Sequence, residues 1–234
     1  MPHILSIDTV SELCSAALWH SEDASPTYFR ESSEKRSHAR MLAPFCAELM
    51  DESGNRPEGV AIVAGPGSYT GLRIGASTAK GLAFSLDIPL FSVSTLHYLA
   101  HAVLGNLETD TIISMIPARQ TEVFAAVFQV QDGILSRLTD DRPIELAHIH
   151  SLATDSMKSI TCVSNTQSVL QAVSENYVDY AVVRATHDAR HLKSLLKNRM
   201  DDFCVKDLHS FEPSYLKEFV AKKATRTLFE RLPF

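Results

Sequence analysis

The sequence predicts an α/β protein made of two small domains that share one order of strands and helices. Three observations support this fold class: a strand-turn-helix pattern at residues 58–86, three strand patterns before it, and a similar order of patterns in the second half. Hydrophobic residues fill 45% of the 234 positions and charged residues 21%. These proportions are typical of a chain with a buried core, and the length allows two such cores.

The central pattern begins with an apolar segment at residues 60–64, which is too short for a helix and predicts a buried strand. Two glycines and a proline then turn the chain at residues 65–67. Ser68 or Thr70 can cap a helix that continues to about residue 86, where a proline follows soon after. The segment therefore predicts one buried strand, a tight turn and a long helix.

Small residues recur at every fourth position of this helix and form one ridge with almost no side chain: Gly71, Gly75, Ala79 and Ala83. A glycine inside a helix costs about 1 kcal/mol relative to alanine, so two of them indicate that another backbone comes close. A second ridge is bulky and includes Leu72. We therefore expect a sheet against one side of the helix and another helix against the other side.

The rest of the first 104 residues shows patterns of further strands and helices. Strands are expected at residues 3–8, 13–20, 26–31 and 90–93, and helices at 36–50 and 94–104. The helix at 36–50 has a wide apolar stripe that includes Met41, Phe45 and Leu49, which predicts two apolar neighbours. Pro44 should kink this helix because it removes a backbone hydrogen bond.

After a polar, turn-rich boundary at residues 105–110, the second half repeats this order of elements without repeating the sequence. Strands are expected at residues 111–116, 122–130, 134–138, 159–163 and 180–184, and helices at 145–157, 166–173, 188–198 and 214–231. Two such βββαβαβα units face each other in the actin-like and sugar-kinase-like (ASKHA) architecture. We therefore divide the chain into an N-terminal domain, 1–104, a C-terminal domain, 108–210, and a segment, 211–234, whose helix braces both.

Charge and cysteine content narrow the function classes. A formal charge of −6 means that a nucleic-acid-binding protein would need a local basic patch. The basic stretch from Lys217 to Arg231 is the candidate, although the solvated face of a helix explains it better. Four cysteines without a CxxC pair, no membrane-length apolar segment and a first strand close to the N-terminus predict a cytoplasmic protein.

The glycine turn does not match the known nucleotide-binding motifs. No Gly-Lys pair follows it at the Walker A spacing, and a dinucleotide fingerprint would need a third glycine at position 70. Backbone N–H groups at the helix start can still hold an anion, with tight packing of strand on helix as the favoured alternative. Asp8 and Thr9 fit equally a phosphate-facing turn and a turn that they cap themselves. The residues of this vestigial anion loop are Asp8, Thr9, Gly65, Gly67 and Ser68.

Patterns for catalysis and metal binding are lacking. A phosphotransferase of the actin and sugar-kinase type needs a second acidic loop and an adenosine loop, yet residues 115–119 contain no acid and residues 164–167 no glycine. There is no GxSxG motif for a nucleophile. Histidine pairs at 97/101, 148/150 and 187/191 lack the HExxH form and a third ligand. We therefore expect no catalytic residue and no metal site.

Several motifs resemble those of the TsaB family, formerly called YeaZ. The most specific is GPGSYTGLRIG at residues 65–75, and the others are IDT at 7–9, SHARMLAP at 37–44, AR and EVF within 118–124, and EPSYLK at 212–217. The chain departs from the family pattern at Pro117, where Asp is usual, and at Lys217, where Arg is usual. His38 matches one histidine of the metal-binding pair in the related TsaD enzymes, and Leu42 replaces the other.

This resemblance implies a non-catalytic subunit that supports a TsaD-like enzyme in making N6-threonylcarbamoyladenosine (t6A) on tRNA. It implies that the first two helices pair with the TsaD-like subunit, or with a second copy when the protein is alone. The expected interface residues are His38, Met41, Leu42, Phe45, Leu49, Gly71, Leu72, Gly75 and Ala79. A charge on the glycine ridge, as in Gly75→Glu, should then block pairing and leave the monomer folded.

The same resemblance implies further partners and ligands. A TsaE-like ATPase would join the larger complex, and tRNA would bind only through that complex. No cofactor would bind tightly, although ATP or ADP can lie at the interface with the partners. Three alternatives stay open: an ATPase or small-molecule kinase that depends on Asp8, a metallopeptidase-like protein with bound zinc, and direct tRNA binding with steep salt dependence.

Overall fold

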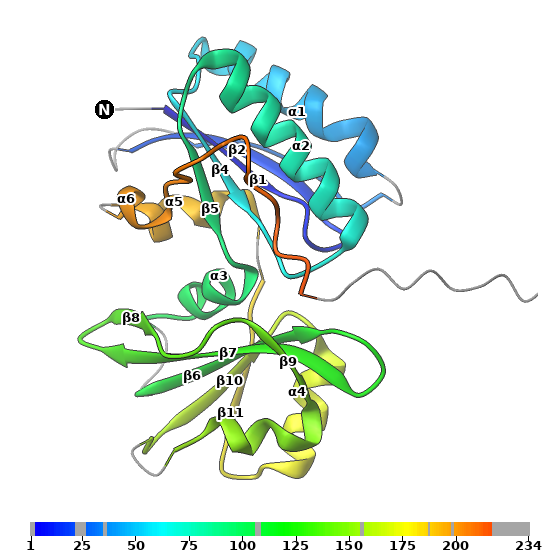
Figure 1. Cartoon of the computed structure of the whole chain (residues 1–234), viewed down its shortest axis with the longest axis vertical. Helices are drawn as coiled ribbons and strands as arrows, with labels where there is room; N and C mark the ends of the chain where they lie inside the picture. The colour runs from blue at the N-terminus through cyan, green and yellow to red at the C-terminus, as the bar shows by residue number, and fades with distance from the viewer. Residues whose placement is uncertain are drawn as a thin grey trace, which may run out of the picture.

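The computed structural model describes residues 3–21, 27–34, 37–105, 109–154, 157–186, 188–197 and 199–216. In these ranges two mixed β-sheets face each other across helix α3 (Thr95–Ala102), as Figure 1 shows. Helices α1 (Ser37–Ser53) and α2 (Tyr69–Leu86) cover the outer face of the first sheet, and α4 (Gln167–Asn176) covers that of the second. None of the helices in the described ranges is long and apolar enough to cross a membrane.

The first sheet has the order β3-β2-β1-β4-β5. Its strands are β1 (His3–Asp8), β2 (Cys14–His20), β3 (Tyr28–Ser32), β4 (Gly59–Val63) and β5 (Leu90–Val93). The first three strands are antiparallel neighbours, whereas β1, β4 and β5 run parallel. Buried residues fill β1, β2 and β4 almost completely because helices cover both faces of the sheet.

The second sheet repeats this order of connections as β8-β7-β6-β10-β11. Its strands are β6 (Thr111–Pro117), β7 (Glu122–Gln131), β8 (Ile134–Arg137), β10 (Ile160–Ser164) and β11 (Ala181–Arg184). The two sheets confirm the expected actin-like fold class, with three antiparallel strands and then two parallel ones in each half.

Two segments of the second half differ from expectation. A short strand, β9 (Arg142–Glu145), pairs with β7 and leads into the 3₁₀ helix η1 (Leu146–Leu152), where one irregular helix over 145–157 was expected. The helix expected at 188–198 is divided into the 3₁₀ helix η2 (Ala189–His191) and α5 (Leu192–Leu196). The backbone of Ala189 bonds to side chains of β1 and β2, which explains why a regular helix does not begin there. A further short helix, α6 (Met200–Phe203), follows.

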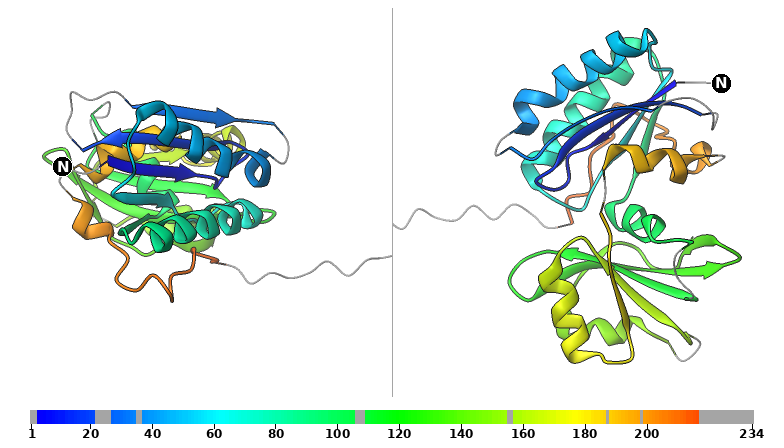
Figure 2. Two further views of the ribbon diagram at one scale, coloured as in Figure 1. Left: turned by 90° about the horizontal axis from the view of Figure 1, so that it is seen from above. Right: turned by 180° about the vertical axis from the view of Figure 1, so that it is seen from behind.

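The segment after β11 returns to the first sheet, although the sequence assigned it to the C-terminal domain 108–210. Residues of η2 and α5 pack with Trp19 and Tyr98 in the core on the inner face of that sheet. Figure 2 shows this segment from behind, lying between the sheets and close to the first one. The domain bounds 1–104, 108–210 and 211–234 themselves stay a prediction.

A strap of residues 204–216 then runs along β5 and α2 (Figure 1). The N–H of Val205 donates to the carbonyl of Leu90 (2.8 Å), and the Lys80 ammonium donates to the carbonyls of His209 (3.0 Å) and Phe211 (2.9 Å). The helix expected at 214–231 does not begin at its first residue, because residues 214–216 are not helical. The rest of that helix, including Lys217, lies outside the described residues.

Candidate partner interface and the turn after the first strand

Local bonds fix where α2 begins and ends. The Ser68 hydroxyl accepts the N–H of Gly71 (3.3 Å), as the expected N-cap residue would. Asp87 ends the helix in the left-handed conformation with a φ of 53°. The N–H of Ser68 also donates to the carbonyl of Val10 (2.8 Å). The helix start is therefore bonded directly to the turn that follows β1.

That turn carries Asp8 and Thr9, and both side chains are buried. Asp8 Oδ1 accepts the N–H of Val10 (3.1 Å), and Thr9 Oγ1 donates to the carbonyl of Gly71 (2.8 Å). Both bonds are internal to the chain. The sequence allows either a turn that faces a phosphate or a turn that Asp8 and Thr9 cap themselves. These contacts are those of a turn that caps itself and packs on α2.

The glycines of α2 allow this close contact. A Cβ atom on Gly71 would overlap the carbonyl oxygen of Thr9, and one on Gly75 would overlap Thr9 Oγ1. The expected close approach of another backbone is therefore present, and the approaching backbone belongs to the same chain. The two glycines cannot also form a surface for a partner.

A cavity of about 570 Å³ lies between the two halves, next to this turn. Two of the five anion-loop residues, Gly67 and Ser68, line it, whereas Asp8, Thr9 and Gly65 do not. The described lining residues of the second half include no acidic residue and are Ile116, Pro117, Asn165, Thr166, Arg184, Ala185 and Thr186. The five predicted residues therefore do not all line this cavity, because Asp8 and Thr9 are buried and Thr9 bonds α2.

Most of the expected interface residues are also buried inside the chain, which corrects the prediction. The side chains of Leu42, Phe45, Leu49, Leu72 and Ala79 are at most 5% exposed and belong to the cores on either face of the first sheet. The stripe on α1 is wide because the helix packs on β2, β3 and α2 at once. A helix stripe that covers a sheet and one that meets a partner look alike in sequence.

The other two expected residues lie at the edge of the covered stripe. His38 and Met41 are half-buried. His38 Nε2 lies 3.0 Å from the carbonyl oxygen of Ser11 and ties the start of α1 to the turn before β2. These two residues alone do not make an apolar platform.

Helical periodicity places small residues on the outer side of α1 and α2, two helices that contact each other. Arg30 of β3 pairs with Glu48 (3.0 Å) and Glu52 (2.6 Å), so this flank of α1 faces the sheet edge. The opposite flank, next to α2, carries the exposed Ala43 and Ala47.

On α2, Lys80 reaches the strap, so the flank that faces α1 is the one that carries Thr78 and Gly81. A Cβ atom on Gly81 would meet nothing within 4 Å. We call Ala43, Ala47, Thr78 and Gly81 the α1–α2 seam. Its signal in the sequence was the recurrence of small residues opposite each apolar stripe, which is also typical of a solvent-exposed face.

His97 and His150 occupy separate environments. His97 of α3 lies between the rings of Phe128 and Phe203, each 5.3 Å away between centroids, and burial lowers its pKa to about 4. His150 Nδ1 lies 2.6 Å from the Tyr180 hydroxyl. Within the described ranges, no three His, Cys, Asp or Glu side chains are grouped so that they could hold a metal ion. His187 lies outside the described residues.

Comparisons with known proteins agree with the motifs. The family model described as "TsaD: tRNA N6-adenosine threonylcarbamoyltransferase" matches residues 31–225. A Bacillus subtilis protein named tRNA threonylcarbamoyladenosine biosynthesis protein TsaB is 27% identical over 92% of this chain and 93% of its own length. The Haemophilus influenzae protein of the same name is 35% identical over 52% of this chain, and that match spans 51% of the relative.

A solved structure described as YeaZ from Pseudomonas aeruginosa has the same fold, with a TM-score of 0.73 and 25% identity. The match covers 92% of this chain and 100% of that one. A second structure, described as an uncharacterized protein with similarity to peptidase YEAZ from Pseudomonas aeruginosa, gives a TM-score of 0.77 at 25% identity, over 93% of this chain and 100% of that one. The glycine-rich start of α2, the repeated sheet order and these matches together show that the chain belongs to the TsaD family and, within it, to the TsaB (YeaZ) group.

Proposed function

We propose that this chain takes part in forming t6A on tRNA in the cytoplasm, as a non-catalytic subunit that supports a TsaD-like enzyme. The names of the matched relatives support the pathway. The non-catalytic role is supported by one observation above all, namely that Asp8 is buried and its carboxylate accepts the N–H of Val10, so that it does not line the cavity between the halves. An acid that coordinates a nucleotide–metal complex would have to face the cavity between the halves.

The proposed contact with the TsaD-like subunit is the α1–α2 seam. Its small side chains let the backbone of another helix come close, as in tightly packed helical bundles. When the protein is alone, the same seam would pair two copies around a two-fold axis. A TsaE-like ATPase would join this complex, with ATP or ADP at an interface and tRNA bound through the complex.

Gly81→Arg tests the seam because position 81 is exposed and open, so the monomer tolerates a long side chain there. We expect the variant to fold normally and to lose at least tenfold in affinity for the TsaD-like subunit, about 1.4 kcal/mol, measured by calorimetry. In a reconstituted reaction, t6A in tRNA measured by mass spectrometry should fall in parallel. Gln171→Arg is the matched control, since it places the same charge on the exposed face of α4.

Unchanged binding and unchanged t6A formation by Gly81→Arg would reject the seam as the contact. If the reconstituted reaction forms as much t6A without this folded chain as with it, the pathway role is rejected. Steady ATP hydrolysis or peptide cleavage by the purified chain alone would contradict the non-catalytic role.

A further inference from the structure

Two described segments carry the chain between the halves. The first contains α3, and the second is the segment from Ala185 to His191, in which residue 187 lies outside the described residues. In two-domain proteins that close on a ligand, such crossings act as hinges, because a few of their residues absorb the change in backbone angles. The contacts of these crossings therefore decide whether the halves can move.

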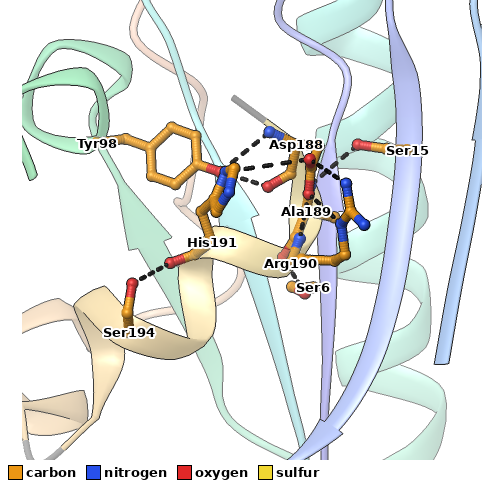
Figure 3. Close-up of polar contacts among 8 residues, drawn as sticks. All are labelled: Ser6, Ser15, Tyr98, Asp188, Ala189, Arg190, His191 and Ser194. Atoms are coloured by element: carbon orange, nitrogen blue, oxygen red, sulfur yellow. Dashed lines mark hydrogen bonds and ion pairs between the residues drawn. The ribbon is translucent and has the colours of Figure 1, made fainter. Parts of the chain in front are cut away.

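Hydroxyl groups bond the backbone N–H and carbonyl groups of two successive residues in the second crossing, Asp188 and Ala189. The Tyr98 hydroxyl donates to the carbonyl of Asp188 and accepts the N–H of the same residue (3.2 Å). Ser15 Oγ accepts the N–H of Ala189 (3.0 Å), and Ser6 Oγ donates to its carbonyl (2.7 Å). Figure 3 shows these hydroxyls converging on the crossing from α3, β1 and β2. All five residues are buried.

A salt bridge within the same crossing places an arginine against the sheet. The Asp188 carboxylate accepts from Arg190 Nε (3.0 Å) and Nη2 (2.8 Å), and this pairing lowers the pKa of Asp188. The guanidinium lies over the ring of Phe29 in β3, 4.0 Å from its centre. The crossing thus contacts three strands of the first sheet.

The first crossing joins the same arrangement through α3. Leu96 and Leu99 of this helix pack into the core of the second sheet, together with Phe128. Tyr98 points the other way, into the core of the first sheet, where burial raises the pKa of its phenol. The hydroxyl of Tyr98 therefore ties a helix anchored in the second half to a segment anchored in the first.

We propose that Tyr98, Ser6 and Ser15 form a lock that fixes the angle between the two halves, so that the molecule does not open and close around its central cavity. Ser6 and Ser15 hold Ala189 on the first sheet, so moving α3 with the second half would strip Asp188 of the Tyr98 hydroxyl in a buried place, where an unpaired backbone group is costly. A subunit that supports an enzyme needs a fixed angle between its two halves. This purpose of the lock rests on the proposed function, whereas the lock itself does not.

Distances between spin labels on the isolated chain test the lock. Asp51→Cys on α1 and Ser174→Cys on α4 place labels on exposed positions of the two halves, and Cys204→Ser removes the exposed native thiol. Labelled chains are diluted with unlabelled chains so that distances within one molecule are read. We expect one narrow distance distribution that ATP with magnesium does not change.

Tyr98→Phe removes only the hydroxyl and should make the distribution roughly twice as wide or shift it. Tyr180→Phe is the matched control, because it removes a hydroxyl of the second half that bonds His150 and not the crossing. If Tyr98→Phe does not fold, Ser15→Ala takes its place.

The lock would be overturned if the unaltered chain gave two label distances, or if ATP shifted its distance. It would also be overturned if Tyr98→Phe and Ser15→Ala both gave distance distributions as narrow as that of the control. Because no partner is present in the experiment, these outcomes leave the pairing proposal untouched. Likewise, normal binding of the TsaD-like subunit by Gly81→Arg would contradict the seam and not the lock.

Discussion

At the scale of single residues, the same amino acid has opposite roles along α2. Gly71 and Gly75 lie where the turn after β1 leaves no room for a side chain, whereas Gly81 faces open space. The sequence predicts a close approach from glycines at this spacing. It does not reveal that the approaching backbone is the chain's own, because no local pattern links Thr9 to a helix 62 residues further on.

Alanine at these glycines should therefore change stability in opposite directions. Gly75→Ala places a methyl group against Thr9 Oγ1, and we expect a loss of about 2 kcal/mol or more in the free energy of unfolding, although alanine favours helix. Gly81→Ala is the control and should gain up to about 1 kcal/mol. Urea unfolding of both variants measures the difference, and equal stabilities would contradict the close packing. For the same reason, Gly75→Glu should unfold the monomer, whereas the sequence alone predicted a folded monomer that cannot pair.

His97 should make stability fall in mild acid. Its pKa is lowered from 6.5 to about 4, first by burial and then by Arg137 and Arg199, so the folded chain keeps it neutral. The unfolded chain takes up a proton near pH 6.5. The stabilisation is therefore complete above this value and is lost as the pH falls toward 4, by about 3 kcal/mol in total.

His97→Phe keeps a ring between Phe128 and Phe203 and removes the titrating group. Urea midpoints at about pH 7 and about pH 5 should differ less for this variant than for the unaltered chain. If both proteins lose the same stability between the two pH values, a group other than His97 causes the loss of stability in acid.

At the scale of elements, sequence patterns predict best what short-range bonds determine. The start of α2 at Ser68 and the strands at 3–8 and 90–93 are confirmed because caps, turns and strand patterns are local. Distant partners instead determine three other features: the direction in which the α1 stripe faces, strand β9, and the divided helix after Asp188. Phe45 shows the difficulty, because its burial follows from contact with a sheet formed by other parts of the chain.

The strap along β5 is another element set by distant contacts, and it should protect the edge of the first sheet. Cys204 pairs with Phe91, and Val205 bonds Leu90, so the strap occupies backbone groups that would otherwise form an open edge. A chain that ends at residue 203 should therefore self-associate in light scattering, whereas one that ends at residue 216 should not. Monodisperse behaviour of the shorter chain would show that β5 needs no cover.

At the scale of the whole molecule, the repeated sheet order was predictable, whereas the distribution of the chain between the halves was not. Each sheet shows the same strand order, which the periodic patterns indicate. Yet the inner face of the first sheet is completed by η2 and α5, which follow the second sheet in sequence. The sequence placed them in the second domain because order along the chain is the only guide to proximity that it offers.

This placement of η2 and α5 has a consequence for how the protein folds during synthesis. The inner face of the first sheet carries Ile4, Trp19 and Val63, and it meets its covering residues only after the ribosome has made Leu192 and Leu196. The amino-terminal half is then complete in sequence long before its hydrophobic surface is shielded. The amino-terminal half is therefore not a free-standing folding module, because its inner face is completed only by residues that follow the second sheet.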